Sequence, residues 1–311
     1  MKKIPVWFDC DTGVDDAIAL ILLSQLESFE VIGVSTVAGN VDLEKTTDNT
    51  LRVLDLCQVS YPVFRGAAKP MMRAQISASY VHGADGLGGV VLPASDRKPE
   101  TLPAWDALYQ AAVTYAGELV LIAVGPMTNI GLTLTKYKDF PSLIKRIVIM
   151  GGAAVGGNVT PAAEFNILAD PEAAAMLFDC GVCVAMCGLD MTMKAYLTRE
   201  ELDELARLGT PQATFARDCL QRALEFGESY QLPGVALHDP AAVLYADDDT
   251  MFEAHPAWVR VETKGSCTYG KTVTDLYSDK KYEMREHLVV ANIDRDAFKA
   301  RLFELFARFG K

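Results

Sequence analysis

The sequence has no long apolar run, no excess of basic residues and only four histidines. A membrane-spanning helix needs about 18 or more consecutive apolar residues, and no such stretch occurs in the 311 residues. The formal net charge of −12 argues against a nucleic-acid-binding surface, because contacts to phosphates require clustered Lys and Arg. The partners that this surface favours are therefore small neutral or cationic molecules, rather than nucleic acids or membranes.

The start of the chain lacks the apolar core of a signal peptide, and the cysteines lack the pattern of a metal site. The apolar run after the two N-terminal lysines is broken at Asp9, so we expect the protein to stay in the cytoplasm. The seven cysteines are an odd number scattered along a long chain, which favours reduced thiols. Cys180, Cys183 and Cys187 lie on an apolar run that indicates a buried strand, without a second pair or a nearby His to complete a zinc set.

Linker-like segments, internal repeats and low-complexity stretches are also missing. Instead, short apolar runs alternate with segments of helical periodicity. We expect strands at 5–8, 31–37, 119–124, 147–150, 182–186, 258–261 and 288–291, and helices at about 14–25, 43–57, 104–116, 128–137, 171–178 and 297–309. Strands this apolar need helices on both faces, which is typical of a mostly parallel sheet. The sequence therefore predicts one α/β domain over residues 1–311.

A helical region is expected beside this sheet. Thr198 and Glu201 have the spacing of a capping box, which opens a mainly helical stretch at about 198–235. In open α/β sheets, ligands bind outside the carboxyl ends of the strands. Polar segments that directly follow expected strands are therefore the first candidates for a functional site, with the helical stretch flanking it.

Four carboxylates follow the first expected strand within eight residues, namely Asp9, Asp11, Asp15 and Asp16. Like charges this close repel one another, so at least one pKa should rise unless a cation neutralises the cluster. Capping of the following helix would use only one of them. An oxygen-only donor set favours a hard cation, Ca²⁺ or Mg²⁺. An EF-hand is excluded, because Val14 stands where its loop requires glycine.

The same segment permits another hypothesis. Residues 8–12 resemble the DxDxT start of haloacid-dehalogenase-type phosphatases, in which the first aspartate is a nucleophile for phosphoryl transfer. That hypothesis leaves Asp15 and Asp16 without a role, and no matching lysine and acidic motif follows downstream. A phosphatase would release phosphate from nucleotides, so its products would distinguish it.

Four more polar segments follow expected strands, at 37–40, 124–129, 150–170 and 237–240. The glycines at 151, 152, 156 and 157 do not match the GxGxxG or P-loop patterns, and they indicate a tight loop. Such a loop would hold Asn158, Glu164 and Asn166, which are able to bind hydroxyl groups. Asp170 precedes Pro171 and is expected to cap a helix.

Two of the four histidines lie in candidate segments. His82 lies in the glycine-rich stretch 81–89, where a lone histidine is usually a surface residue. His238 differs, because Asp239 beside it offers another carboxylate at a helix start. His255 and His287 lie by expected strands without partners, and we expect no catalytic role for them.

Taken together, these segments resemble the inosine–uridine-preferring nucleoside hydrolase family over nearly the whole chain. The signature is Asp9-Cys-Asp-Thr-Gly-Val-Asp-Asp16, and the matching segments 39–40, 82–88, 125–130, 157–161, 163–166 and 238–240 follow in order. The resemblance implies a Rossmann-like fold and Ca²⁺-dependent hydrolysis of the N-glycosidic bond of ribonucleosides to free base and ribose, in nucleoside salvage. It also implies a homo-oligomer, either a dimer or a tetramer.

The resemblance also implies roles for single residues. The Ca²⁺ ligands that it implies are Asp11, Asp16, Asp239 and the backbone carbonyl of Val124, with Asp9 in support. Asp11 matches the general base, which takes a proton from water. His238 matches a histidine near the leaving base, either as a general acid or as support for Asp239.

The implied substrate contacts are Asp15, Asn40 and Asn166 at the ribose diol, Asn158 and Glu164 near the 5′-hydroxyl, and His82, Phe165, Phe226 and Tyr230 elsewhere in the pocket. Carboxylates and amide oxygens suit this reaction, because cleavage builds positive charge on the ribose ring. The pair Phe226 and Tyr230 indicates no particular base, so a purine, a pyrimidine and a modified base stay open. A non-catalytic nucleoside-binding protein is the further alternative, although Asp11 and the implied ligands are all present.

Overall fold

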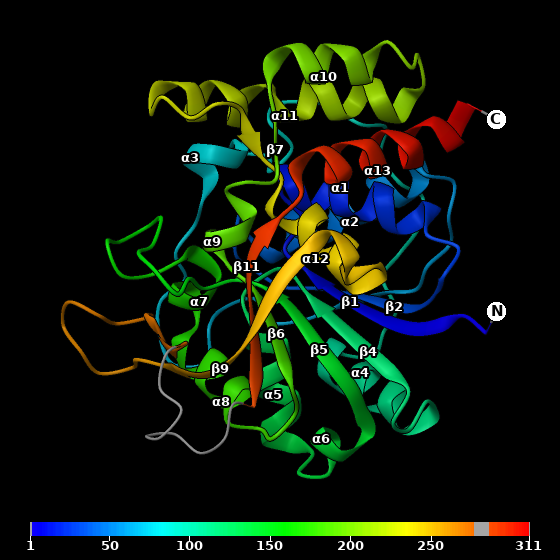
Figure 1. The fold of residues 1–311 in the computed structure, drawn as a ribbon. Helices are drawn as coiled ribbons and strands as arrows, with labels where there is room; N and C mark the ends of the chain where they lie inside the picture. The colour runs from blue at the N-terminus through cyan, green and yellow to red at the C-terminus, as the bar shows by residue number, and fades with distance from the viewer. Residues whose placement is uncertain (1, 277–285, 311) are drawn as a thin grey trace.

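Nine strands form one sheet in the computed structural model, which describes residues 2–276 and 286–310 (Figure 1). The strand order is β10-β9-β11-β6-β5-β4-β1-β2-β3. The strands are β1 (Ile4–Cys10), β2 (Phe29–Thr36), β3 (Val63–Arg65), β4 (Leu119–Ala123), β5 (Ile144–Met150), β6 (Val184–Cys187), β9 (Phe252–Val261), β10 (Thr272–Asp275) and β11 (His287–Ile293). All neighbours from β11 to β3 pair in parallel, whereas β9 is antiparallel to β10 and β11. The predicted mostly parallel sheet is confirmed.

Helices cover both faces of this sheet, because the central strands carry apolar side chains on both faces and neither face can be exposed to water. In β4, for example, all five residues of the sequence LVLIA are buried. One face packs against α1 (Val14–Gln25), α2 (Leu43–Leu56), α12 (His238–Asp247) and α13 (Arg295–Ala307). The other face packs against α4 (Ala104–Thr114), α5 (Thr128–Lys136), α6 (Phe140–Leu143) and α8 (Pro171–Phe178). The remaining elements are α3 (Ser79–His82), α7 (Phe165–Ala169), α9 (Leu189–Thr192), α10 (Arg199–Ala206), α11 (Pro211–Ser229), the pair β7 (Tyr196–Leu197) and β8 (Val235–Ala236), and the 3₁₀ turns η1 (Asp249–Met251) and η2 (Arg308–Gly310).

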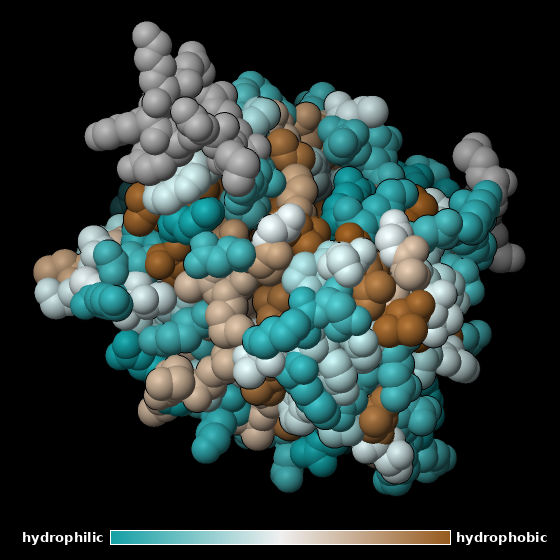
Figure 2. Space-filling model, turned by 90° about the horizontal axis from the view of Figure 1, so that it is seen from below, coloured by the Kyte–Doolittle hydropathy of each residue, from teal (hydrophilic) through white to brown (hydrophobic). Residues whose placement is uncertain are grey.

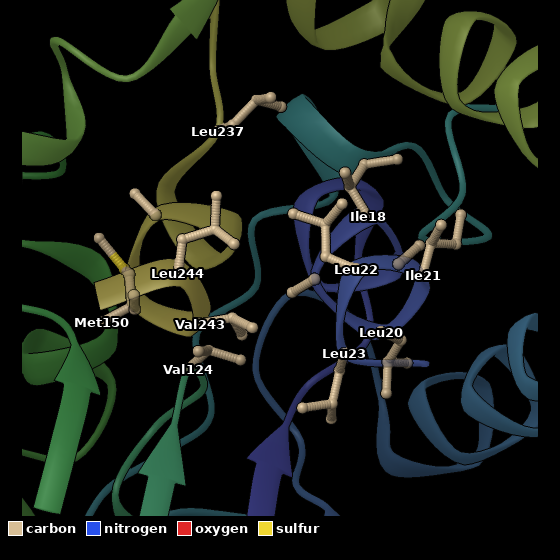
Figure 3. Close-up of a cluster of buried hydrophobic side chains, with 14 of the residues drawn as sticks. Ile18, Leu20, Ile21, Leu22, Leu23, Val124, Met150, Leu237, Val243 and Leu244 are labelled. Atoms are coloured by element: carbon tan, nitrogen blue, oxygen red, sulfur yellow. The ribbon is translucent and has the colours of Figure 1, made fainter. Parts of the chain in front are cut away.

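The packing of α1 against α12 positions the carboxyl-end edge of the sheet. Ile18 and Leu22 of α1 lie in one cluster with Val243 and Leu244 of α12, and none of these side chains is more than 1% exposed (Figure 3). Burial of each such side chain contributes about 1.5–3 kcal/mol. Helix α1 begins shortly after β1 ends, and α12 begins shortly after β8 ends. The packing therefore holds the first turn of α1 close to the first turn of α12.

The region expected to be helical lies beside this edge, at the top of Figure 1. It contains α10 and α11, and α11 packs against both α1 and α3. The predicted capping box is present, because the Thr198 hydroxyl accepts from the Glu201 amide and the Glu201 carboxylate accepts from the Thr198 amide. The strands β7 and β8 pair at the base of this region.

Several local predictions are wrong. His82 ends the short helix α3 and is buried, where an exposed loop residue was expected. Cys183 is exposed before β6, so the buried strand is shorter than its apolar run. His287 does have partners, because its two ring nitrogens lie within hydrogen-bond distance of backbone groups of β6 and α8.

The molecular surface is more hydrophilic than the two hydrophobic cores, which lie on either side of the sheet. Seen from below, it mixes hydrophilic residues with small hydrophobic patches (Figure 2). Within residues 2–276 and 286–310, no helix is both long enough and apolar enough to cross a membrane. All seven cysteines are free thiols.

Candidate active site

Three carboxylates converge where α1 and α12 begin. Asp15 and Asp16 lie in the first turn of α1, and Asp239 lies in the first turn of α12. One oxygen of each carboxylate lies within 4.8 Å of an oxygen of each of the others, and all three residues are buried. Anions this close repel one another strongly away from water. The arrangement therefore favours a cation among them.

Asp11 lies directly after β1 and adds a fourth buried carboxylate. Its Oδ2 accepts a hydrogen bond from the Asn40 amide at 2.7 Å, whereas its Oδ1 is buried without a hydrogen-bond partner among the described residues. Gly39 makes this approach possible, since a Cβ there would lie 2.1 Å from Oδ2 of Asp11. Buried polar atoms are normally paired, so the free oxygen is suited to bind a metal or a water molecule.

The carboxylate of Asp16 is held in place by three donors. Its Oδ1 accepts from the Asp11 amide at 3.0 Å, and its Oδ2 accepts from the Gly13 amide at 2.9 Å. The side-chain amide of Asn40 donates to Oδ2 at 3.0 Å. Asn40 thus orients two carboxylates, which the sequence did not indicate, and only its side-chain oxygen is left for a substrate hydroxyl.

Burial raises the pKa values of this cluster. It raises the pKa of Asp15 to about 8, and repulsion from Asp16 adds to the rise. The pKa values of Asp11 and Asp239 rise well above their usual range, through burial first and neighbouring carboxylates second. A divalent cation would oppose these shifts, because it stabilises the ionised form. The oxygen-only donor set and the free oxygen on Asp11 fit a hard divalent cation.

Asp9 lies beneath the cluster and supports it. Its Oδ2 accepts hydrogen bonds from the Ser35 hydroxyl and from the side-chain amide of Asn129, the latter at 2.7 Å. The Asn129 side chain also binds the Thr36 carbonyl and the Ala67 amide. Asn129 therefore ties β1 and β2 to α5, a role that no local pattern in the sequence indicated.

Asn166 and Glu164 bind the backbone around the site. The Asn166 amide donates to the carbonyl of Val124 at 2.7 Å and to that of Met150 at 3.1 Å. The Glu164 carboxylate caps α7 by accepting from the amides of Asn166 and Ile167. Burial raises the pKa of Glu164 to about 7. Both side chains thus bind backbone groups of the site, in addition to the substrate contacts expected of them.

The two candidate histidines are neutral side chains near the carboxylates. The Nδ1 atom of His82 accepts from the Val14 amide at 3.1 Å and lies 3.9 Å from Asp15 Oδ1. Because Nδ1 is an acceptor, Nε2 carries the ring proton. The Nδ1 atom of His238 lies 2.8 Å from the Thr192 hydroxyl. Burial lowers the pKa of His82 to about 3 and that of His238 to about 4.

One cavity of about 230 Å³ is lined by Asp15 and Asp239 of the cluster, whereas Asp9, Asp11 and Asp16 are fully buried and are not among its described lining residues. The site residues predicted from the sequence that line it are Asp15, Asn40, His82, Val124, Asn158, Glu164, Phe165, Asn166, Phe226, His238 and Asp239. Where α3 meets α11, its wall is aromatic, and the rings of Tyr80 and Phe226 lie 5.8 Å apart between centroids. Tyr80 and Met150 also line the cavity, and no pattern in the sequence indicated a role for either.

Tyr230 is the predicted contact residue that the structure places farthest out. Its side chain is 69% exposed and is not part of the cavity wall among the described residues. Its ring packs against that of Phe226, with 5.0 Å between centroids. Its role as a base contact stays a prediction.

Comparison with known proteins agrees with this geometry. The family model described as inosine-uridine preferring nucleoside hydrolase matches residues 6–300. The pyrimidine-specific ribonucleoside hydrolase RihA of Shewanella woodyi is 40% identical over 297 residues, which cover 94% of this chain and 95% of that protein. A purine-preferring ribonucleoside hydrolase from Gardnerella vaginalis has a structure with a TM-score of 0.93, at 32% identity over 99% of both chains.

These matches bear on the alternative hypotheses. A plant nucleoside hydrolase also has the same fold, with a TM-score of 0.92 and 31% identity over 98% of this chain and 99% of the other. The phosphatase hypothesis leaves Asp15 and Asp16 unexplained, yet both belong to the carboxylate cluster. Neither that hypothesis nor the non-catalytic one is favoured. The chain belongs to the inosine–uridine preferring nucleoside hydrolase family and is an enzyme that cleaves the N-glycosidic bond of nucleosides.

Proposed function

We propose that this enzyme is a Ca²⁺-dependent ribonucleoside hydrolase that releases a free base and ribose in nucleoside salvage. The observation that carries the proposal is the buried carboxylate cluster at the cavity, with its unpartnered oxygen on Asp11. Asp11, Asp16, Asp239 and the carbonyl of Val124 would hold the cation. Ca²⁺ accepts irregular sets of carboxylates and carbonyls, whereas Mg²⁺ keeps several of its waters and demands octahedral geometry.

Different residues of the site have different roles in the reaction. A bound Ca²⁺ would lower the pKa of a water molecule and orient the ribose hydroxyls. Asp11 accepts the proton of the attacking water through its free oxygen. Asp15 and the side-chain oxygens of Asn40 and Asn166 bind the 2′- and 3′-hydroxyls. The surrounding carboxylates stabilise the positive charge that develops on the ribose ring.

The leaving base needs a proton, or it departs as an anion. We assign this proton transfer to His238, which lines the cavity beside Asp239. Because burial lowers its pKa to about 4, the ring must gain a proton in the substrate complex before it can donate one. Its contact with Thr192 fixes the ring, as a proton donor requires. His82 also lines the cavity and carries its ring proton on Nε2, so we expect it to contact the substrate.

The proposal also covers the base that the enzyme prefers in its substrate. The RihA relative is named pyrimidine-specific and the Gardnerella protein purine-preferring. The identity to RihA, 40%, is higher than the 32% to the Gardnerella protein, so uridine and cytidine are the first substrates to test.

The compartment and the assembly are further parts of the proposal. Seven free cysteines favour a reducing compartment such as the cytoplasm. We expect a homo-oligomer, a dimer or a tetramer, which light scattering would measure.

A nucleoside screen with chromatographic detection of the released base tests the activity. We expect uracil and ribose from uridine, with kcat/KM at least about 10²-fold lower for deoxyuridine and uridine 5′-monophosphate, because the site binds the 2′-hydroxyl and Glu164 repels a phosphate. Release of phosphate without free base would instead support the phosphatase. Binding of nucleosides without turnover would support a non-catalytic protein.

Elemental analysis of protein purified without added metal tests the cation. We expect one Ca²⁺ per chain, and we expect chelation to remove the activity. Stoichiometric zinc, or full activity after the metal has been removed, would contradict the proposed site.

A further inference from the structure

The loop at 151–163 carries Asn158 to the rim of the cavity but has few apolar anchors. Val155 is 80% exposed and Val159 is 39% exposed. The stretch contains no helix or strand. Core packing holds only the two ends of this loop, at Ala153 and Ala163, which are each 1% exposed. Polar contacts must therefore contribute to the position of the stretch between them, which includes Asn158.

Lys271, which directly precedes β10, binds this loop through its carbonyl groups. Its Nζ donates to the carbonyl oxygens of Ala153 at 2.9 Å, Ala154 at 3.0 Å and Gly156 at 3.4 Å. Three acceptors use all the donors of an ammonium group. Because the donor is charged, these bonds are stronger than neutral ones. The Lys271 ammonium group thus holds three carbonyl oxygens of the loop together, as a bound metal ion would.

Asp190, in the first turn of α9, binds the same loop through its amides. Its Oδ2 accepts from the Ala154 amide at 2.6 Å and its Oδ1 accepts from the Val155 amide at 3.0 Å. The Thr272 hydroxyl adds bonds to both backbone groups of Ala153. One short stretch of backbone is therefore bound by a cation at its carbonyls and by an anion at its amides.

These contacts are linked to the side chains that face the substrate. Glu164 accepts from the Gly152 amide at 2.8 Å, on one side of the bound stretch. On the other side, the Asn158 side-chain oxygen accepts from the Phe165 amide at 3.0 Å, which leaves its NH₂ group for a ligand. The Asn158 amide also donates to the Ala163 carbonyl at 3.2 Å. Two sets of contacts therefore position Asn158, its own bonds to Ala163 and Phe165 and the bonds that hold 153–156, and loss of the second set would loosen Asn158 relative to Glu164.

We propose that Lys271 and Asp190 are positioning residues, which clamp the loop and thereby hold Asn158 at the 5′-hydroxyl of the ribose. This inference rests on the proposed function, because it assigns Asn158 to a ribonucleoside. Neither residue lines the cavity among the described residues, so both act through the loop. Loss of the clamp should weaken binding of the 5′ end and spare the chemistry at the carboxylate cluster.

The variant Lys271→Met removes the charge and keeps the length of the side chain. We expect KM for uridine to rise about tenfold, as for a lost charged hydrogen bond, with a smaller change in kcat. The preference for uridine over 5′-deoxyuridine should shrink, because the second substrate lacks the group that Asn158 binds. Asp190→Asn should act in the same direction to a smaller extent. Lys264→Met, an exposed lysine nearby in the chain, is the matched control and should be unchanged.

Other outcomes would overturn the clamp. Equal losses on uridine and 5′-deoxyuridine would indicate general damage, and unchanged kinetics would show that the loop holds without Lys271. If Lys271→Met does not fold, Asp190→Asn decides by the same substrate ratio. Hydrogen exchange at the amides of Ala154 and Val155 gives a readout without activity, and it should quicken in Lys271→Met and Asp190→Asn but not in Lys264→Met. Failure of the wild-type enzyme to cleave any ribonucleoside would contradict the proposed function, while unchanged exchange would contradict the clamp.

Discussion

The two ends of the cavity are built in opposite ways. At the carboxylate end, the side chains of Asp16, in the first turn of α1, and Asn40, in the loop after β2, are fixed by hydrogen bonds to backbone groups and to one another. At the end formed by α3 and α11, the rings of Tyr80 and Phe226 form part of the wall, Tyr230 packs outside it against Phe226, and Tyr80 and Tyr230 are 51% and 69% exposed.

We infer that the carboxylate end carries out the chemistry and that the end formed by α3 and α11 selects the base. Catalysis requires groups held within a fraction of an ångström, which buried hydrogen bonds provide. A face of exposed rings can accept different bases, because every base offers a flat surface for stacking. Related enzymes of the same fold are named pyrimidine-specific and purine-preferring. We therefore expect the carboxylate end to be the constant end of the cavity and the end formed by α3 and α11 to be the variable end.

The sharpest test of the constant end is Asp11→Asn. We expect kcat to fall by about 10²–10⁴-fold, because the variant cannot accept the proton of the attacking water. The fold should be intact, since the side chains have the same shape. Metal content measured beside kcat separates loss of the base from loss of the cation. Near-normal turnover would remove Asp11 from the role of general base.

His238→Ala tests whether the proton donor belongs to the constant end. If His238 protonates the leaving base, kcat for uridine should fall by about 10²-fold. Turnover of p-nitrophenyl riboside should hardly change, because that leaving group needs no proton. If His238 only supports Asp239, both substrates should suffer alike. Parallel losses on the two substrates would therefore defeat the acid assignment.

The constant end could be predicted from the sequence because its signals are local. Four carboxylates within eight residues, between an apolar strand and a helix, indicate a cation site without any knowledge of tertiary contacts. The central strands were equally clear, since β4 is apolar throughout. The cap at Asp170 was predicted correctly, because Asp170 accepts from the Ala173 amide directly before α8.

The features that sequence reasoning missed depend on partners distant in the chain. β3 and β10 have only three and four residues, and their neighbours in the sheet, rather than their own periodicity, make them strands. His82 is buried because its ring accepts from the Val14 amide. The aromatic wall brings α3 to α11, and no spacing in the sequence relates Tyr80 to Phe226.

The variable end is tested by Phe226→Ala, for which we expect the smallest effect. Phe226 is half-buried at the cavity between Tyr80 and Tyr230, so its ring offers a stacking face to a bound base. Loss of one aromatic contact should raise KM about 3- to 10-fold for uridine and inosine alike, with kcat little changed, because stacking holds the base before and during cleavage. Phe226→Leu keeps an apolar side chain without the ring, so it separates stacking from simple burial and should retain most of the defect. If kcat falls as it does for Asp11→Asn, Phe226 contributes to the chemistry, and the separation between the two ends of the cavity is wrong.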